Sequence, residues 1–121
     1  AVASLSGALM MQETYGTRED PEWTREMDAI FGSEKALRAG DGNLARLADA
    51  LKPEKTPAMY VACGTADFLY EANQAFIAAY GQKFGIRYET EEGASHTWDF
   101  WDREIEKVLA WLPLEALESL W

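Results

Sequence analysis

Residues 57–67, Pro-Ala-Met-Tyr-Val-Ala-Cys-Gly-Thr-Ala-Asp, carry the strongest strand signal in this chain. A continuous apolar run of strand length, from Ala58 to Cys63, follows a proline and ends at Gly64. A strand that is apolar at every position, and not only at every second one, is typical of a parallel sheet covered on both faces. We therefore expect a buried parallel strand here, with Asp67 just beyond its carboxyl end.

Two further strands are expected along the chain. Residues 1–5 are a short apolar run that closes in Ser6-Gly7, and residues 86–90 alternate imperfectly between apolar and polar. The acids in and after the second of these runs indicate a solvated edge strand; they are Glu89, Glu91 and Glu92.

Helical signals fill the segments between and after the strands. Residues 21–31 follow an aspartate cap, start with a proline and carry apolar residues at helical spacing. Shorter helices are expected after Ser33 and Asn43, a longer one ends near Gly85, and an amphipathic helix with acids in its first turn ends at Pro113. Residues 8–17 have no clear period and are expected to form a loop that can line a site, and residues 114–121 a final helical turn.

This order of elements predicts a single α/β unit over residues 1–121. Three parallel strands, joined by right-handed crossovers, would give a β-α-β-α-β-α arrangement with helices packed on the sheet faces. In an open parallel sheet, sites collect beyond the carboxyl ends of the strands. Asp67 follows the second strand and His96 follows the third, so we expect these two side chains to meet.

The composition limits the classes of partner. The chain has 121 residues, is 48% hydrophobic and contains five tryptophans, which indicates one packed domain. A formal net charge of −10 argues against binding to nucleic acid or to an anionic membrane surface, and no apolar run reaches the roughly 20 residues of a membrane-spanning helix. The single cysteine, Cys63, fits a reducing compartment, so we expect a cytoplasmic protein.

His96 is the only histidine in the chain. Imidazole takes and gives protons near neutral pH, so a histidine before a helix invites a catalytic interpretation, although a lone histidine is more often structural. An acid beside it would hold its tautomer and stabilise the imidazolium that forms when the ring takes a proton from a nucleophile. Asp67 and His96 are thus two parts of a candidate triad, with a solvated turn or a helix cap as the alternative for Asp67.

Two loops of the chain resemble those of a known family. Residues 63–71, CGTADFLYE, and residues 93–101, GASHTWDFW, resemble the acid loop and the histidine loop of the esterase D-like α/β-hydrolases, which include tributyrin and acetyl esterases and S-formylglutathione hydrolases. Residues 3–8, ASLSGA, look like the strand after the nucleophile helix of that family. The resemblance implies that Asp67 orients the ring and that His96 is the general base and acid of a serine esterase for short acyl esters or thioesters. It implies neither a cofactor nor a metal.

The nucleophile of that family has no counterpart in these residues. The Gly-x-Ser-x-Gly elbow does not occur in the sequence, and Ser4, Ser6 and Ser95 do not stand in such a motif. We therefore expect the chain to be the C-terminal half of a hydrolase domain, with the serine and the oxyanion-hole amides outside it. The first strand would then have an unpaired edge that the N-terminal half, or another copy of the chain, completes.

Several assignments have alternatives. Phe68, Leu69 and Trp98 can line an acyl or alcohol pocket or simply pack, whereas Trp101 is expected in the core. Cys63 shares a loop with Asp67, so burial explains it better than a nucleophilic role, and the chain has no ligand spacing for zinc. The alternative to an esterase is a non-catalytic half-domain that folds or associates without turnover of its own.

Overall fold

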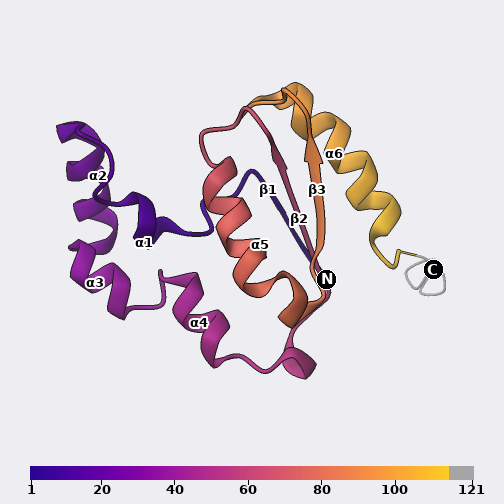
Figure 1. Ribbon diagram of the computed structural model, residues 1–121, viewed down its shortest axis with the longest axis horizontal. Coiled ribbons are helices and arrows are strands. Elements are labelled where there is room, and N and C mark those ends of the chain that lie inside the picture. The colour runs from indigo at the N-terminus through magenta and orange to yellow at the C-terminus, as the bar shows by residue number, and fades with distance from the viewer. Residues whose placement is uncertain (115–121) are drawn as a thin grey trace.

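The computed structural model describes residues 1–114 and contains one sheet. Its strands are β1 (Val2–Leu5), β2 (Met59–Gly64) and β3 (Arg87–Glu91), which lie in the order β1-β2-β3 with both pairs parallel (Figure 1). The predicted three-stranded parallel α/β arrangement is confirmed. Strand β3 lies at one edge of the sheet, as its acids predicted, and β1 lies at the other.

The longer helices follow the sequence signals. They are α2 (Pro21–Phe31), α3 (Glu34–Ala39), α4 (Leu44–Ala50), α5 (Tyr70–Phe84) and α6 (Trp98–Trp111). Asp20, Ser33 and Asn43 each cap a helix by accepting a hydrogen bond from a backbone N–H of its first turn, because those groups have no partner within the helix. Gly85 ends α5 in the left-handed conformation that favours glycine.

The segment before α2 differs from its expectation. Residues 8–17 are not wholly a loop, because one helical turn, α1 (Met11–Thr14), forms within them. A turn this short has no room for an apolar period, so no periodic pattern predicted it. Residues 53–55 form a short 3₁₀ helix, Pro53–Lys55, and the final helical turn expected at the C-terminus falls mostly on residues 115–121, outside the described residues.

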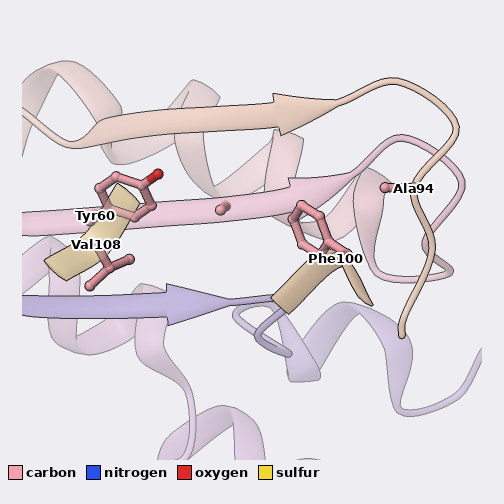
Figure 2. Close-up of a cluster of buried hydrophobic side chains, with 5 residues drawn as sticks. Tyr60, Ala94, Phe100 and Val108 are labelled. Carbon is pink, nitrogen blue, oxygen red and sulfur yellow. The ribbon is translucent and has the colours of Figure 1, made fainter. Parts of the chain in front are cut away.

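Two helices cover the sheet, one on each face. Helix α5 contacts β2 and β3, and α6 contacts β1 and β2 from the opposite side (Figure 1). Because side chains alternate along a strand, Tyr60 and Ala62 of β2 point toward α6, where they join Phe100, Val108 and Ala94 in a buried cluster (Figure 2). Strand β2 is therefore buried on both faces, which explains its continuous apolar run.

Helices α1, α2 and α3, which follow β1 in the chain, form a separate group. Residues of α1, α2 and α3 pack around a small core of Tyr15, Met27 and Leu37, and this group lies beyond α5, away from the sheet (Figure 1). Helix α4 packs against α5. No helix within residues 1–114 is long and apolar enough to span a bilayer.

Candidate active site

The loops that follow β2 and β3 are held together by close backbone contacts. A Cβ at Gly64 would lie 2.1 Å from the Ala94 carbonyl oxygen, so only glycine permits this approach. The Ala66 N–H donates to the same carbonyl at 2.9 Å, and the Gly93 N–H donates to Thr65 Oγ1 at 2.8 Å. These bonds fix the acid loop against the histidine loop.

Asp67 and His96 meet across this junction. The Asp67 side chain is fully buried; its Oδ1 accepts a hydrogen bond from the Leu69 N–H at 2.8 Å, and its Oδ2 lies 3.0 Å from His96 Nδ1. The carboxylate is thus held at both oxygens, and the bond to Nδ1 turns Nε2 of the ring away from it. The predicted meeting of the two side chains is confirmed, while their catalytic roles stay a prediction.

Aromatic rings enclose the imidazole on two sides. The ring centroid of Phe68 lies 5.0 Å from that of His96, and Trp101 meets the imidazole edge-on at 4.9 Å. The Trp101 Nε1–H donates to Ser6 Oγ at 3.0 Å, which fixes the indole. Trp101 packs against the core cluster, as predicted, but its contact with the histidine ring comes from folding residues 6 and 101 together and has no sequence signal.

His96 lines a largely apolar pocket of about 390 Å³. Phe68 and Leu69 line it too, and the separate helical group supplies its other wall through Met11, Arg18 and Trp23. Residues 8–17, expected as a segment that can line a site, contribute to this wall. Sequence reasoning missed Arg18 and Trp23, because neither stands in a motif and Trp23 fits the period of an ordinary amphipathic helix.

Trp98 lies apart from this pocket. It is not among the residues that line the pocket with His96, and its side chain is exposed and packs edge-on against Trp101, with ring centroids 5.1 Å apart. The structure therefore does not bring Trp98 together with Phe68 and Leu69. Its role in substrate binding, like theirs, stays a prediction.

A buried asparagine joins the start of the helical group to the acid loop. Asn73 of α5 is fully buried, and its Nδ2 donates to the Gly7 and Leu69 carbonyl oxygens, both at 2.9 Å. Gly7 follows β1 and Leu69 follows Asp67, so one side chain links the ends of two neighbouring strands. Sequence reasoning missed Asn73, since a polar residue within an amphipathic helix normally faces solvent.

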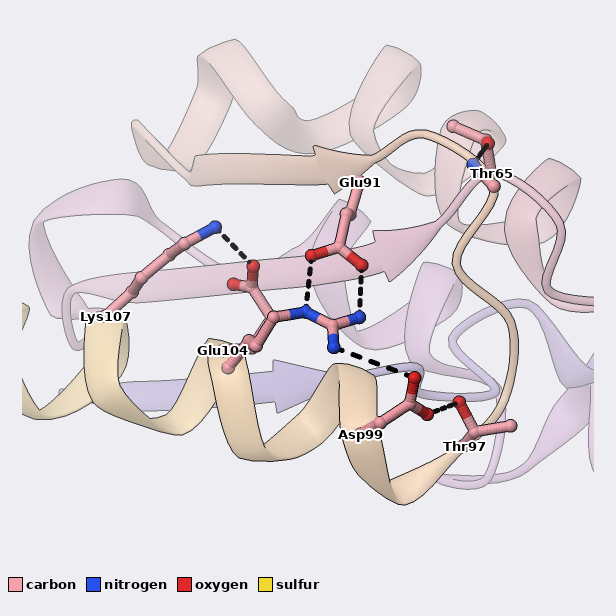
Figure 3. Close-up of polar contacts among 8 residues, drawn as sticks. Thr65, Glu91, Thr97, Asp99, Glu104 and Lys107 are labelled. Carbon is pink, nitrogen blue, oxygen red and sulfur yellow. Dashed lines mark hydrogen bonds and ion pairs between the residues drawn. The ribbon is translucent and has the colours of Figure 1, made fainter.

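Ion pairs hold α6 to β3 next to the histidine loop. Arg103 donates to both carboxylate oxygens of Glu91, at 2.8 and 2.6 Å, and its third nitrogen lies 3.6 Å from Asp99, which also accepts from the Thr97 hydroxyl (Figure 3). The hydrogen bonds from Arg103 lower the pKa of Glu91. The pKa of Asp99 is also lowered, mainly by the hydrogen bond from Thr97 and to a smaller extent by the charge of Arg103. The expectation that Glu91 is a solvated edge acid was wrong, because it is half-buried and paired with an arginine twelve positions away in the chain.

A carboxylate is buried where α6 crosses the sheet. Glu104 is fully buried, accepts from the Tyr60 hydroxyl at 2.8 Å and from Lys107 Nζ at 2.7 Å, and is drawn with Lys107 in Figure 3. Burial, followed by this bond to Glu104, raises the pKa of Tyr60 well above its ordinary value. These bonds tie α6 to β2. They lie farther along α6 from the histidine loop than Arg103 does.

Cys63 is unsuited to act as a nucleophile. It is fully buried, and that burial, with the nearby charge of Asp67, raises the pKa of its thiol to about 12. The thiol therefore stays protonated near neutral pH. Within residues 1–114, no group of three or more His, Cys, Asp or Glu side chains could hold a metal ion.

Comparison with known proteins gives both sequence and structural relatives. No protein-family model matches the chain. It is 30% identical over 118 residues to an acetyl esterase from Caldicellulosiruptor saccharolyticus, with 92% of this chain and 44% of the relative covered. The chain thus spans less than half the length of this relative.

Solved structures match most of the chain. The S-formylglutathione hydrolase FrmB from Staphylococcus aureus superimposes with a TM-score of 0.70 at 22% identity, over 90% of this chain and 42% of that one. The fluorophosphonate-binding serine hydrolase FphF of the same organism gives a TM-score of 0.66 at 21% identity, with the same two shares covered. The chain therefore has the fold of part of an α/β-hydrolase, and it resembles the esterase D-like branch, as its acid and histidine loops predicted.

Proposed function

We propose that this chain supplies the acid and the histidine of a serine carboxylic-ester hydrolase, and that the nucleophilic serine lies outside these residues. The observation that supports this most directly is the bond between the buried Asp67 carboxylate and His96 Nδ1, at 3.0 Å, beside a pocket. The likeness to an acetyl esterase favours short acyl esters, and the fold match to an S-formylglutathione hydrolase extends the class to thioesters.

In this mechanism His96 accepts one proton and then donates it again in each half-reaction. Its Nε2 takes the serine proton as Oγ attacks the acyl carbon, and the resulting imidazolium gives that proton to the leaving alkoxide or thiolate. A water molecule then attacks the acyl-enzyme by the same route, and the carboxylic acid leaves. Asp67 keeps the proton of the neutral ring on Nδ1 and stabilises the imidazolium, because its buried charge is 3.0 Å away.

His96→Ala tests this assignment in the protein that carries both this chain and the serine. We expect kcat/KM for p-nitrophenyl acetate to fall by about 10⁴-fold or more, since His96 is the only histidine of this chain. Gln82→Ala, an exposed change near the far end of α5, serves as the control and should leave activity unchanged. Turnover by the His96→Ala protein within a few-fold of the wild type would contradict the assignment.

The 121 residues alone should neither hydrolyse p-nitrophenyl acetate nor react with a fluorophosphonate, because Gly-x-Ser-x-Gly does not occur in them. Labelling of the isolated chain would show that it contains the nucleophile. A protein that includes the elbow yet neither labels nor turns over esters would favour the alternative, a non-catalytic module.

We also propose that further strands of the sheet pair with β1. Strand β1 is an edge strand, and beside it lies an apolar hollow of about 310 Å³ that includes the exposed side chains Val2, Leu44 and Leu51. An open strand edge next to apolar surface favours association. In the full protein, the nucleophile-bearing half would pair with β1; in the isolated chain, a second copy would do so. Light scattering of the isolated chain should then show a dimer or a larger species. A stable monomer at high concentration would contradict pairing with a second copy.

A further inference from the structure

Among the described residues that line the pocket beside His96, Arg18 alone carries a permanent positive charge. Its Cζ lies over two aromatic rings, 4.7 Å from the ring centroid of Trp23 and 5.4 Å from that of Phe68. Phe68 in turn lies against His96, with ring centroids 5.0 Å apart. The guanidinium and the imidazole therefore both contact the Phe68 ring.

No acidic side chain of the pocket offsets this charge. Among the described residues that line the pocket, none is Asp or Glu, and within residues 1–114 Arg18 makes no ion pair. In a chain with a formal net charge of −10, acids are plentiful, and Arg38, Arg46, Arg87 and Arg103 each pair with at least one. Arg18 is thus a cation left available at the wall of a largely apolar pocket.

The chemistry of the guanidinium group indicates what this cation can bind. Aromatic faces attract a guanidinium and hold its position, while its N–H groups form a planar fork that matches the two oxygens of a carboxylate. A carboxylate bound there would also contact the faces of Trp23 and Phe68, although Arg18 and Phe68 are themselves exposed. An uncharged acyl chain would gain nothing from the fork.

We propose that Arg18 binds a carboxylate of the substrate, so that the preferred esters or thioesters carry a carboxylate a short chain away from the scissile carbonyl. This inference rests on the proposed role of His96 and extends it by naming the substrate class. The carboxylate can belong to the acyl group or to the leaving group, because both extend from the carbon that is attacked. The connecting chain would lie along Phe68.

Two matched pairs of esters test the preference in the protein that carries both this chain and the serine. The p-nitrophenyl monoester of adipic acid is compared with p-nitrophenyl hexanoate, and the acetate ester of para-hydroxybenzoate with that of its methyl ester. The wild type should prefer the charged member of one pair by about ten- to a hundredfold in kcat/KM, as expected for a hydrogen-bonded charge pair. The first pair of esters tests for a carboxylate on the acyl group, and the second pair tests for a carboxylate on the leaving group.

Arg18→Met removes the charge and keeps most of the stem. The ratio of kcat/KM between the charged and the neutral ester should fall by the same ten- to hundredfold, while Arg25→Met, a change of an exposed arginine on α2 that does not line this pocket, should leave the ratio unchanged. Arg18→Lys keeps a charge without the fork and should give an intermediate ratio. A wild type that prefers neither charged ester, or an Arg18→Met ratio within twofold of wild type, would overturn the proposal.

A binding measurement separates this proposal from the proposed catalytic function. The unreactive p-nitroanilides of adipic and hexanoic acid are added to the His96→Ala protein, and binding is followed by ligand-observed NMR. The charged anilide should bind more tightly, and Arg18→Met should remove the difference. Arg18-dependent binding without ester turnover by the wild type would refute the esterase alone, whereas His96-dependent turnover without Arg18-dependent preference or binding would overturn the role of Arg18 alone.

Discussion

Replacing Asp67 with Asn tests whether the acid acts through the tautomer of His96. Both carboxylate oxygens have a partner: Oδ1 accepts from the Leu69 N–H at 2.8 Å, and Oδ2 lies 3.0 Å from His96 Nδ1. An amide has only one oxygen. If it keeps the bond to Leu69, the amide N–H₂ faces Nδ1, and the ring must carry its proton on Nε2, where it can no longer accept one from the nucleophile.

The other orientation of the amide in Asp67→Asn, with its oxygen toward His96, costs free energy because it leaves a buried donor without a partner. With the oxygen toward His96, the amide N–H₂ faces the Leu69 N–H in a fully buried place, so a donor is left unsatisfied at about 1–3 kcal/mol. The active tautomer would then be populated about 5- to 150-fold less. Loss of the negative charge weakens the imidazolium further, so we expect kcat to fall by about 10⁴-fold overall.

The assay is hydrolysis of p-nitrophenyl acetate by the protein that includes the serine, with the rate of fluorophosphonate labelling as a second readout. The melting temperature and circular dichroism should stay close to wild type, because the amide keeps the shape of the carboxylate. Asp102→Asn makes the same change on an exposed residue of α6 and should leave both rates unchanged. A folded Asp67→Asn protein with activity within tenfold of wild type would show that the acid does not act through the tautomer of His96.

Three further predictions concern residues that hold the loops and helix around Asp67 and His96 in place. Gly64→Ala places a Cβ 2.1 Å from the Ala94 carbonyl oxygen, so it should lower both the melting temperature and esterase activity; an unchanged melting temperature would contradict the close approach. The Cys63 thiol, with a pKa of about 12 and no exposed surface, should not react with a disulfide reagent at pH 8 until urea unfolds the protein, and rapid labelling of the native state would count against its burial. Glu91 has a lowered pKa in the folded protein, so its bond to Arg103 stabilises the fold above the ordinary carboxyl pKa of about 4.3 and is lost as the pH falls through the folded value. Arg103→Met should therefore lower the melting temperature at pH 7 and bring it closer to the wild-type value at acidic pH, whereas equal loss at both pH values would argue against the pairing.

Local patterns were sufficient for the elements and for the edge where the site lies. The continuous apolar run of β2 predicted a strand covered on both faces, and α5 and α6 cover them. Because carboxyl ends of parallel strands meet at one edge, the positions of Asp67 and His96 after consecutive strands were enough to predict that they meet. Helix α1 was missed because a single turn is too short to show a period.

The walls of the pocket could not be predicted in the same way. Arg18 and Trp23 belong to a helical group with its own small core, and that group reaches the site only through the path of the chain between β1 and β2. Trp98 shows the reverse case, because it is close to His96 in the sequence but does not share its pocket. It stands two positions after His96, but the first turn of α6 directs it to solvent. Nearness in sequence was therefore a poor guide to which side chains share the pocket.

Sequence patterns were enough to predict the parallel α/β class, the order of its elements and the pairing of Asp67 with His96, because each depends on local periodicity, capping or the end of a strand. The three-dimensional packing was needed to show that Ser6 holds Trp101 against the imidazole, that Arg103 binds Glu91, and that Arg18 lies over Phe68 without an ion pair within residues 1–114. These contacts join segments far apart in the chain. Their partners are chosen by the packing of whole helices against the sheet, which no local pattern encodes.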